Sequence, residues 1–299
     1  MFVVLGANGH TGRVVANHLL ERGQKVRVVG RNAERLRDLA DRNAEVFVAD
    51  VSDGPGLTKA FRGAEAAYVL VPPNPTSTDY RAFQERVSDA IAAAVQNSGT
   101  KRVVALSSVG ADKASGTGPV VGLHNVEQKL NQIDDTSVLY LRAGYFMENL
   151  LPQVAVVRMM GSVAGPVRPD LKLPMIATED IGAAAAKALV DGDFRGKQTR
   201  ELQGERDLSY VEAAAIIGRA IDKPSLGYVQ VPDEQFRTAL KQMGMSENMA
   251  GLILEMAGAL NSGHMKALEP RAAENSTPTS FEKFVEEEFA PAYREQVAA

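Results

Sequence analysis

Short apolar runs alternate with longer amphipathic segments through the first half of the chain. The apolar runs are Phe2 to Leu5, Val26 to Val29, Glu45 to Ala49, Ala66 to Val71, Arg102 to Ser107 and Ser137 to Leu141. Between them, apolar positions recur with the helical period, as at Val14, Val15, His18 and Leu19 in the first segment and Ala90, Ile91, Ala94 and Val95 in the fourth. Strands that alternate with helices in this way predict an α/β fold of the Rossmann type, a doubly wound parallel sheet with helices on both faces.

Beyond Pro152 the alternation breaks down, which predicts a smaller mixed α/β lobe on the substrate side. We therefore expect a Rossmann domain over residues 1–152 that also takes in parts of 178–203, and the smaller lobe over residues 153–299. A mixed region to Ala177 is followed by predicted elements at Glu179 to Val190 (helix), Thr199 to Gln203 (strand), Ser209 to Ile221, Asp233 to Met243, Glu247 to Leu260 and Phe281 to Phe289 (helices). Asp180 and Ser209 are interpreted as residues at or near helix N-caps.

The segment after the first strand carries the clearest chemical signal. Gly6, Gly9 and Gly12 stand in the spacing GxxGxxG between a buried strand and the helix that opens near His10. Glycines there permit a tight turn, close approach of backbone to a pyrophosphate, and close packing of the helix on the sheet. The N–H groups and dipole of the helix would attract the phosphates, with Asn8, His10 and Thr11 beside them. An ordinary tight turn is the alternative interpretation.

The end of the second strand indicates which dinucleotide is preferred. Where NAD-binding proteins place a carboxylate for the ribose 2′-hydroxyl, this chain has Gly30-Arg31-Asn32. A guanidinium can make charge-assisted hydrogen bonds to a 2′-phosphate, so Arg31 favours NADPH over NADH, with Arg35 as a second possible contact. The alternative is a solvated charge at a strand end.

In a doubly wound fold, ligands bind beyond the carboxyl ends of the strands. The other strand ends are therefore further candidate cofactor contacts: Asp50, Val51, Val71, Pro72, Ser107 and Ser108. The loops Pro72 to Thr78 and Ala111 to Pro119 flank this predicted crevice and are candidates for mobile lids.

Composition narrows the function classes. The chain has 299 residues, 45% of them hydrophobic, a net charge of -4 and no cysteine. Without cysteine there are no disulfides, thiolate zinc sites or cysteine nucleophiles, which suits a reducing cytoplasm. The charge balance and lack of basic blocks argue against direct nucleic-acid binding, and no apolar stretch is long enough to span a bilayer. The four histidines are scattered without ligand spacing, so we expect no metal, and Ser107-Ser108-Val109-Gly110 lacks the upstream glycine of a nucleophile elbow.

The chain resembles, over nearly its whole length, the NmrA-like branch of the atypical short-chain dehydrogenase/reductases. That branch includes NADPH-dependent quinone and triphenylmethane-dye reductases as well as redox-sensing regulators. The segments that carry the resemblance are Gly6 to Gly12 (glycine loop), Gly30 to Asn32 (2′-phosphate site), Ala49 to Val51 (adenine contact), Arg142 to Asn149, Ala177 to Gly182, and Thr277 to Val285 (C-terminal helix). Asn8 departs from the threonine that is common in this loop.

The usual catalytic pair of short-chain dehydrogenases is absent. None of the tyrosines has a lysine four residues later: Tyr68, Tyr80, Tyr140, Tyr145, Tyr210, Tyr228 and Tyr293. On the corresponding helix, the segment Leu123 to Lys129 resembles the histidine-bearing segment of the NmrA-like branch and offers His124. Imidazole ordinarily titrates near neutrality, so His124 is a candidate proton donor, and a structural histidine is the equal alternative.

The missing base favours acceptors of hydride over donors. Alcohol oxidation needs a positioned base, whereas hydride delivered to a quinone or cationic dye gives a product that water can protonate. We therefore expect an NADPH-dependent oxidoreductase, a monomer or homodimer, that reduces a quinone-like or other conjugated small molecule. Tyr145, Phe146 and Met147 are candidates for the substrate wall, and Met243, Met245, Met249 and Met256 for either an apolar pocket or core. The alternative function is a non-enzymatic NADP(H)-binding redox sensor that regulates transcription.

Overall fold

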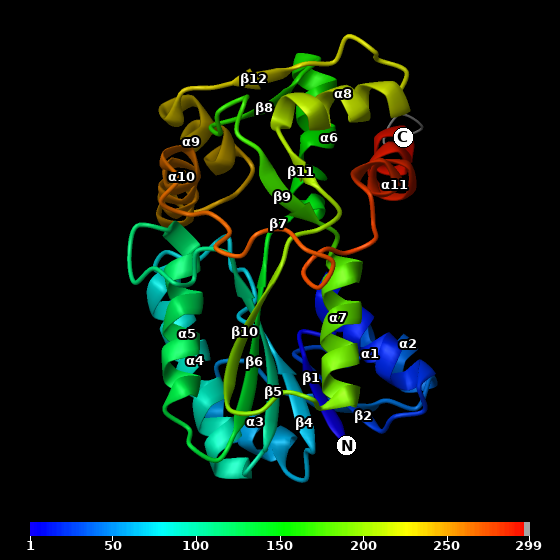
Figure 1. Cartoon of the computed structure of the whole chain (residues 1–299), viewed down its shortest axis with the longest axis vertical. Helices are drawn as coiled ribbons and strands as arrows, with labels where there is room; N and C mark the ends of the chain where they lie inside the picture. The colour runs from blue at the N-terminus through cyan, green and yellow to red at the C-terminus, as the bar shows by residue number, and fades with distance from the viewer. Residues whose placement is uncertain (296–299) are drawn as a thin grey trace.

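A seven-stranded parallel sheet forms the lower part of the molecule in the computed structural model, which describes residues 1–295 (Figure 1). The strand order is β10-β6-β5-β4-β1-β2-β3, and every neighbouring pair is parallel. The order reverses between β1 and β4, which is the switch point where doubly wound folds open a crevice. The predicted fold class is confirmed.

The strands of this sheet alternate with helices along the chain. Their bounds are β1 (Phe2–Leu5), α1 (His10–Glu21), β2 (Val26–Gly30), η1 (Glu34–Leu36), α2 (Arg37–Asp41), β3 (Glu45–Val48), α3 (Gly54–Phe61), β4 (Ala66–Val69), α4 (Tyr80–Ser98), β5 (Arg102–Ser108), η2 (Gly118–Val120), α5 (Val121–Asn131), β6 (Ser137–Ala143), α7 (Thr178–Asp191) and β10 (Lys197–Leu202).

Most predicted strand ends lie within one residue of those observed, although β6 ends two residues later than predicted, at Ala143, and β10 starts two residues earlier, at Lys197. The prediction extends β4 to Val71, but this strand ends at Val69. Pro72 and Pro73 follow, and proline both lacks the N–H that a sheet requires and restricts the residue before it. The strand therefore stops early and releases Leu70 and Val71 into the loop beyond the sheet.

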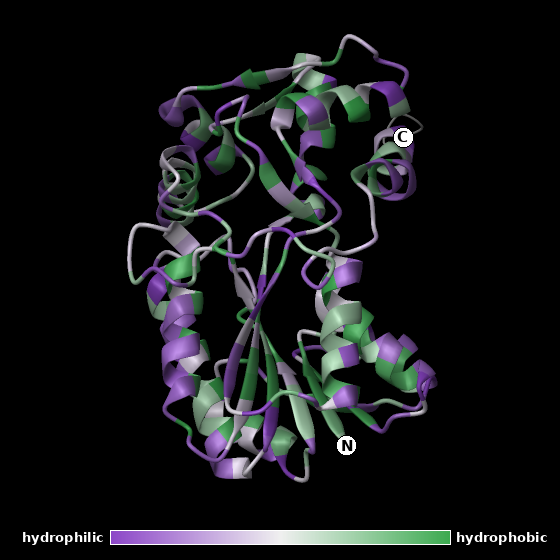
Figure 2. Ribbon diagram, in the orientation of Figure 1, coloured by the Kyte–Doolittle hydropathy of each residue, from purple (hydrophilic) through white to green (hydrophobic). Residues whose placement is uncertain are grey.

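Both faces of the sheet are buried under helices, which explains why its central strands are apolar on both faces. One core packs α1 and α7 against residues such as Val4, Val28 and Tyr68. The other packs α3, α4 and α5 against the alternate strand positions, such as Val3 and Ala67. Figure 2 shows the central strands as hydrophobic and the edge strand β10 as hydrophilic. A polar edge strand discourages pairing with other chains.

The upper lobe holds two small sheets and the remaining helices (Figure 1). One sheet has the order β11-β9-β7 with one antiparallel and one parallel pair, and the other pairs β12 with β8 in parallel. The elements are β7 (Tyr145–Phe146), η3 (Met147–Leu150), α6 (Gln153–Met160), β8 (Val163–Gly165), β9 (Leu173–Ile176), β11 (Asp207–Leu208), α8 (Tyr210–Ala220), β12 (Tyr228–Gln230), α9 (Asp233–Gln242), α10 (Glu247–Ser262), α11 (Phe281–Phe284), the π-helical turn η4 (Val285–Phe289) and α12 (Ala290–Glu295). Residues 296–299 of the predicted lobe lie outside the described residues.

The two predicted N-cap residues behave differently. Ser209 caps α8 in a capping box with Glu212, as predicted. Asp180 lies in the first turn of α7, near the N-cap as predicted, but it does not cap the helix, because its carboxylate accepts hydrogen bonds from the backbone N–H (3.0 Å) and hydroxyl (2.8 Å) of Thr279. At the start of α7, the backbone N–H of Thr178 instead donates a hydrogen bond to the carboxylate of Glu148 at 2.8 Å.

Both loops predicted as mobile lids are held by α10 of the upper lobe. In the loop after β4, Pro75 and Ser77 accept hydrogen bonds from the N–H and hydroxyl of Ser246 at the start of α10. In the loop after β5, Gly118 packs so closely on the Leu252 carbonyl that a Cβ would not fit. Two anchored loops therefore connect the sheet to α10 of the upper lobe.

The segment that follows α10 crosses from the upper lobe to the sheet. Met265 packs on Gly110, just beyond the end of β5, where an added Cβ would lie 2.6 Å from the Met265 Cγ. Glu201 on β10 is buried and accepts backbone N–H groups of Leu268 and Glu269, each at 2.9 Å. This segment thus ties the upper lobe to β10 and to the loop after β5.

Candidate functional site

The glycine loop after β1 makes the tight turn and the close helix packing that its spacing predicts. Gly6 has a φ of +68°, and its carbonyl accepts the N–H of Gly9 at 2.8 Å. A Cβ at Gly12 would lie 2.8 Å from the Leu5 carbonyl oxygen and closer still to that of Gly6. Only glycine lets α1 start this close to the strand end.

The start of α1 is open to an anion. Its N-cap is Gly9, no side chain caps it, and no acidic residue stands in its first turn. The first N–H groups of a helix have no partner within the helix and attract phosphate. The Thr11 hydroxyl accepts a hydrogen bond from the hydroxyl of buried Tyr68 at 2.9 Å, and this bond connects α1 to β4. The backbone N–H of Thr11 can still donate to a phosphate.

Asn8 and Arg31 lie together at the ends of β1 and β2. A Cβ at Gly30 would lie 3.1 Å from the Asn8 side-chain nitrogen, which places Asn8 over the end of β2. Arg31 is exposed and acts electrostatically on Asp50, which follows β3. Hydrogen bonds from the hydroxyl (2.6 Å) and N–H (2.8 Å) of Ser52 lower the pKa of Asp50, and the Arg31 guanidinium lowers it further.

A second arginine, missed by the sequence analysis, holds the same corner together. Arg13 of α1 pairs with Asp38 and donates to the Arg35 carbonyl at 3.0 Å. This contact fixes η1 and α2 beside the cradle. The predicted contacts Arg31 and Arg35 thus follow β2 in a segment that Arg13 holds to α1, and Val51, which follows β3, packs on the core.

The remaining cofactor candidates lie at the ends of β4 and β5. Val71 packs against the core and the Pro72 carbonyl accepts from the Tyr80 hydroxyl at 3.4 Å. Ser107 is buried and its hydroxyl donates to Glu127 of α5 at 2.6 Å, while Ser108 donates to the Val109 carbonyl at 2.9 Å. Both hydroxyl protons are thus committed within the protein, and the serines can act toward a ligand as acceptors.

His124 of α5 stands beside the loop after β5. Its Nδ1 lies 2.8 Å from the Ala111 carbonyl oxygen. A carbonyl only accepts, so Nδ1 carries a proton, and in the neutral ring Nε2 carries a lone pair. The contact fits both sequence interpretations, because it orients a structural histidine and equally fixes the tautomer of a reactive one.

Tyr145, the other catalytic candidate, belongs to a group of three tyrosines. Its oxygen accepts the hydroxyl of Tyr210 at 2.7 Å, and the Tyr210 ring stacks on Tyr228 at a centroid distance of 4.9 Å. Tyr228 in turn donates to the Val167 carbonyl at 2.6 Å. Burial raises the pKa of Tyr145 and Tyr210, so both remain protonated at neutral pH.

The other wall candidates are mostly packed. Phe146 packs on the sheet core, and Met147 is buried in the upper lobe. Of the methionines, Met249 and Met256 pack in apolar clusters, whereas Met243 is exposed. The packing of these side chains favours their interpretation as core residues over their interpretation as the lining of an adaptable pocket.

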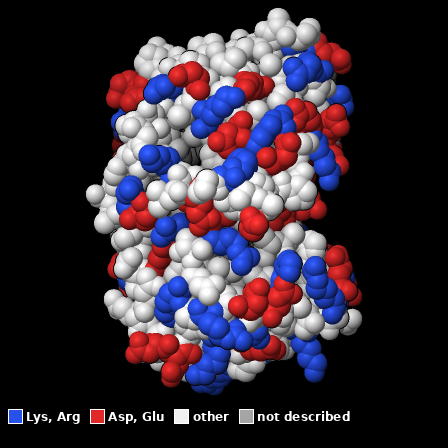
Figure 3. Space-filling model, viewed as in Figure 1, with Lys and Arg blue, Asp and Glu red and all other residues white. Residues whose placement is uncertain are grey.

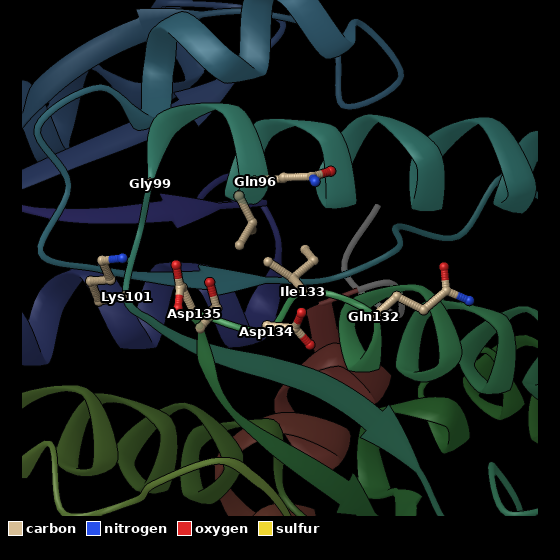
Figure 4. A pocket seen from close by; sticks show the side chains of 9 residues that line it. Gln96, Gly99, Lys101, Gln132, Ile133, Asp134 and Asp135 are labelled. Atoms are coloured by element: carbon tan, nitrogen blue, oxygen red, sulfur yellow. The ribbon is translucent and has the colours of Figure 1, made fainter.

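A separate hollow lies far from these residues, at the edge where the strands begin. Figure 4 shows its lining, with Lys101 directly before β5 and Asp134 and Asp135 before β6. Ligands of doubly wound folds bind at the opposite strand ends, so this hollow has no part in the site. Figure 3 shows acidic and basic side chains interspersed on the face in view.

Two other observations concern the described residues. Within residues 1–295, no group of three or more His, Asp or Glu side chains is arranged to hold a metal ion. In the same range, none of the helices combines the length and the apolar character needed to cross a bilayer.

Comparison with known proteins agrees with this architecture. NAD(P)H azoreductase of Xenophilus azovorans is 27% identical over 258 residues, which are 86% of each chain. An NADPH-dependent quinone oxidoreductase of Escherichia coli, solved with NADPH, superposes with a TM-score of 0.81 at 22% identity, covering 95% of this chain and 98% of that one. NmrA, a negative transcriptional regulator solved with NADP, gives 0.72 at 17%, covering 99% and 97%. The model of the NmrA-like family matches residues 1–289, and the chain belongs to this family, as its sequence motifs predict.

Proposed function

We propose that this protein is an NADPH-dependent reductase that delivers hydride to a quinone-like or other conjugated small-molecule acceptor. The observation that carries the proposal is the glycine loop before α1, where an uncapped helix start packs closely on the strand end through Gly12, together with exposed Arg31 directly after the neighbouring strand β2. The names of the similar azoreductase and quinone oxidoreductase support the same chemistry.

The residues present fit a dinucleotide. The backbone around Gly6, Gly9 and Gly12 and the first N–H groups of α1, from His10 and Thr11, would hold the pyrophosphate. Asn8 and Arg31 would meet the adenosine 2′-phosphate, with Asp50 and Val51 toward the adenine. Val71, Pro72, Ser107 and Ser108 would border the nicotinamide, whose C4 supplies a hydride when the cofactor is bound. NADH fits less well because it offers Arg31 no phosphate.

The protein's own task is then mainly positioning. His124 lies on α5 and Tyr145 directly after β6, and in this proposal both would stand near the nicotinamide end of the cofactor. Neither forms the tyrosine-lysine pair that alcohol oxidation uses, so reduction of a hydride acceptor is the reaction that this residue set serves best.

The test is an assay of NADPH oxidation against a panel of quinones, azo compounds and triphenylmethane dyes. We expect turnover with at least one acceptor and a higher kcat/KM with NADPH than with NADH. Absence of turnover with every acceptor, for protein shown to bind NADPH, would reject the reductase proposal.

A second candidate is a non-enzymatic redox sensor, favoured by the fold likeness to the regulator NmrA over nearly the whole chain. A sensor must bind NADP⁺ and NADPH with different affinities, and its partner must respond to the difference. Calorimetry that gives equal affinities for the two forms would reject it. The absence of cysteine suits a cytoplasmic location, where either role would operate on the cellular NADPH pool.

A further inference from the structure

The tyrosine group in the upper lobe has a defined direction of hydrogen bonding. Tyr228 donates to a backbone carbonyl, and Tyr210 donates to the Tyr145 oxygen. Tyr145 therefore acts as an acceptor, and its own hydroxyl proton has no acceptor within residues 1–295. In this group, Tyr145 holds the proton that is free to be donated.

The position of Tyr145 makes that proton relevant to chemistry. Tyr145 follows β6 after Gly144, whose N–H donates to the Leu202 carbonyl at 2.8 Å. Its ring packs on the core cluster of the upper lobe, a cluster that also takes in Ala111 of the loop after β5 and Met265, which packs on Gly110. The ring also meets Tyr210 edge-on, with a centroid distance of 6.1 Å and an interplanar angle of 70°.

We propose that Tyr145 donates its proton to the carbonyl oxygen of a bound quinone-type acceptor, and that Tyr210 is the positioning residue that turns this proton toward the substrate. This inference rests on the proposed reductase function and deepens it, since it names the proton donor and the acceptor class. Tyr210 was not singled out by the sequence, which offers no local signal for a pairing across 65 positions.

The step balances for a para-quinone. NADPH, when bound, would supply the hydride of its C4–H bond to one quinone oxygen, and the two electrons would reduce the ring to the aromatic state. Negative charge then develops on the other oxygen, which receives the Tyr145 proton. The Tyr210 proton moves to Tyr145, and a proton from solvent restores Tyr210. The sum is quinone, NADPH and one proton giving hydroquinone and NADP⁺.

Tyr145 is a better candidate for the proton donor than the neutral form of His124. With Nδ1 donating to Ala111, a neutral His124 presents a lone pair at Nε2. It can accept a hydrogen bond there but has no proton to give. Tyr145 offers an O–H, and the hydrogen bond that it accepts from Tyr210 strengthens its own donation.

The experiment compares two acceptors in the intact protein. A para-quinone needs a proton after hydride transfer, whereas a cationic triphenylmethane dye becomes neutral on receiving hydride and needs none. We expect Tyr145→Phe to lower the ratio of kcat/KM for quinone to kcat/KM for dye by about 10- to 100-fold, the effect of a lost hydrogen bond to a charged group. Tyr210→Phe should lower the same ratio by roughly 3- to 10-fold.

Tyr228→Phe is the matched control. It removes a hydroxyl from the same cluster and retains the ring stacked on Tyr210, but its proton serves the Val167 carbonyl. The ratio should stay within about twofold of the wild-type value, as expected for a group outside the proton path. A fall in all three variants, or in none, would overturn the proposal.

A binding measurement separates this inference from the proposed function. Para-nitrophenol is titrated spectroscopically when bound to the NADP⁺ complex, without turnover. Donation by Tyr145 stabilises its anion, so the ionisation constant of the bound probe should be about tenfold larger in the wild type than in Tyr145→Phe. If the wild type reduces neither acceptor, the reductase function fails while this titration still decides the donor. If the titration shows no difference, Tyr145 is not the donor.

Discussion

Glu127 and Arg142 form a bidentate ion pair beneath the ends of β5 and β6. Arg142 Nε donates to Glu127 Oε1 at 3.0 Å and Nη2 to Oε2 at 2.6 Å, and Glu127 is only 3% exposed. Glu127 also accepts the Ser107 hydroxyl, so this pair connects α5, β5 and β6 directly under the candidate nicotinamide region.

Breaking this pair should cost substantial stability. Glu127→Ala leaves Arg142 as an uncompensated charge, with an expected loss of about 3–5 kcal/mol in the free energy of unfolding, measured by urea denaturation. The double variant Glu127→Met with Arg142→Met has no such charge and should lose less. A single-variant loss below about 1 kcal/mol would show that the pair is solvated.

The close approach of Gly12 to β1 makes a second prediction. Gly12→Ala should cost about 1–3 kcal/mol of stability through overpacking and abolish measurable dinucleotide binding. Gly258→Ala on α10 is the control, because it is exposed and its Cβ would meet nothing within 4 Å. That variant should gain about 0.5–1 kcal/mol from helix propensity. Equal behaviour of the two variants would contradict the cradle.

Arg31 should decide between the two nicotinamide cofactors. We expect Arg31→Ala to weaken NADPH binding by about 1–3 kcal/mol in calorimetry and to change NADH binding little, as for a lost charged hydrogen bond. Arg37→Ala, which removes an arginine with 71% side-chain exposure nearby on α2, is the control and should leave both affinities unchanged. A matched loss for both cofactors in Arg31→Ala would mean that this guanidinium does not contact the phosphate.

Asp50 gives a pH-dependent prediction. Its pKa is lowered below the ordinary 3.8, chiefly by the Ser52 hydroxyl, so it contributes stability above the unfolded pKa that is lost as pH falls through the folded pKa. Ser52→Ala should move this pKa upward and make the protein less stable at neutral pH, and the difference should be smaller at a pH below the folded pKa of Asp50. Denaturation at both pH values tests this, with the Asp50 carboxyl pKa followed by NMR. A difference that persists unchanged in acid would assign the effect of Ser52 to packing.

The agreement between sequence and structure is best where the signal is local. Glycine spacing, strand period and the Ser209 capping box each depend on residues close in the chain, and each is found where the sequence predicts it. Agreement weakens where a side chain has to choose a distant partner. Aspartate is a residue type that often caps helices, yet the Asp180 carboxylate accepts a hydrogen bond from Thr279, 99 positions away.

The sequence by itself determined the Rossmann architecture, the cradle after β1 and the arginine beyond β2, because backbone periodicity and turn geometry arise from neighbouring residues. Only the tertiary structure decided which hydroxyl meets which partner. The hydroxyl of Thr11 is hydrogen-bonded to Tyr68, that of Ser107 to Glu127 and that of Tyr145 to Tyr210, across separations of 57, 20 and 65 positions. Such pairings follow from how the packed sheets and helices bring distant side chains together, and no local pattern along the chain encodes that.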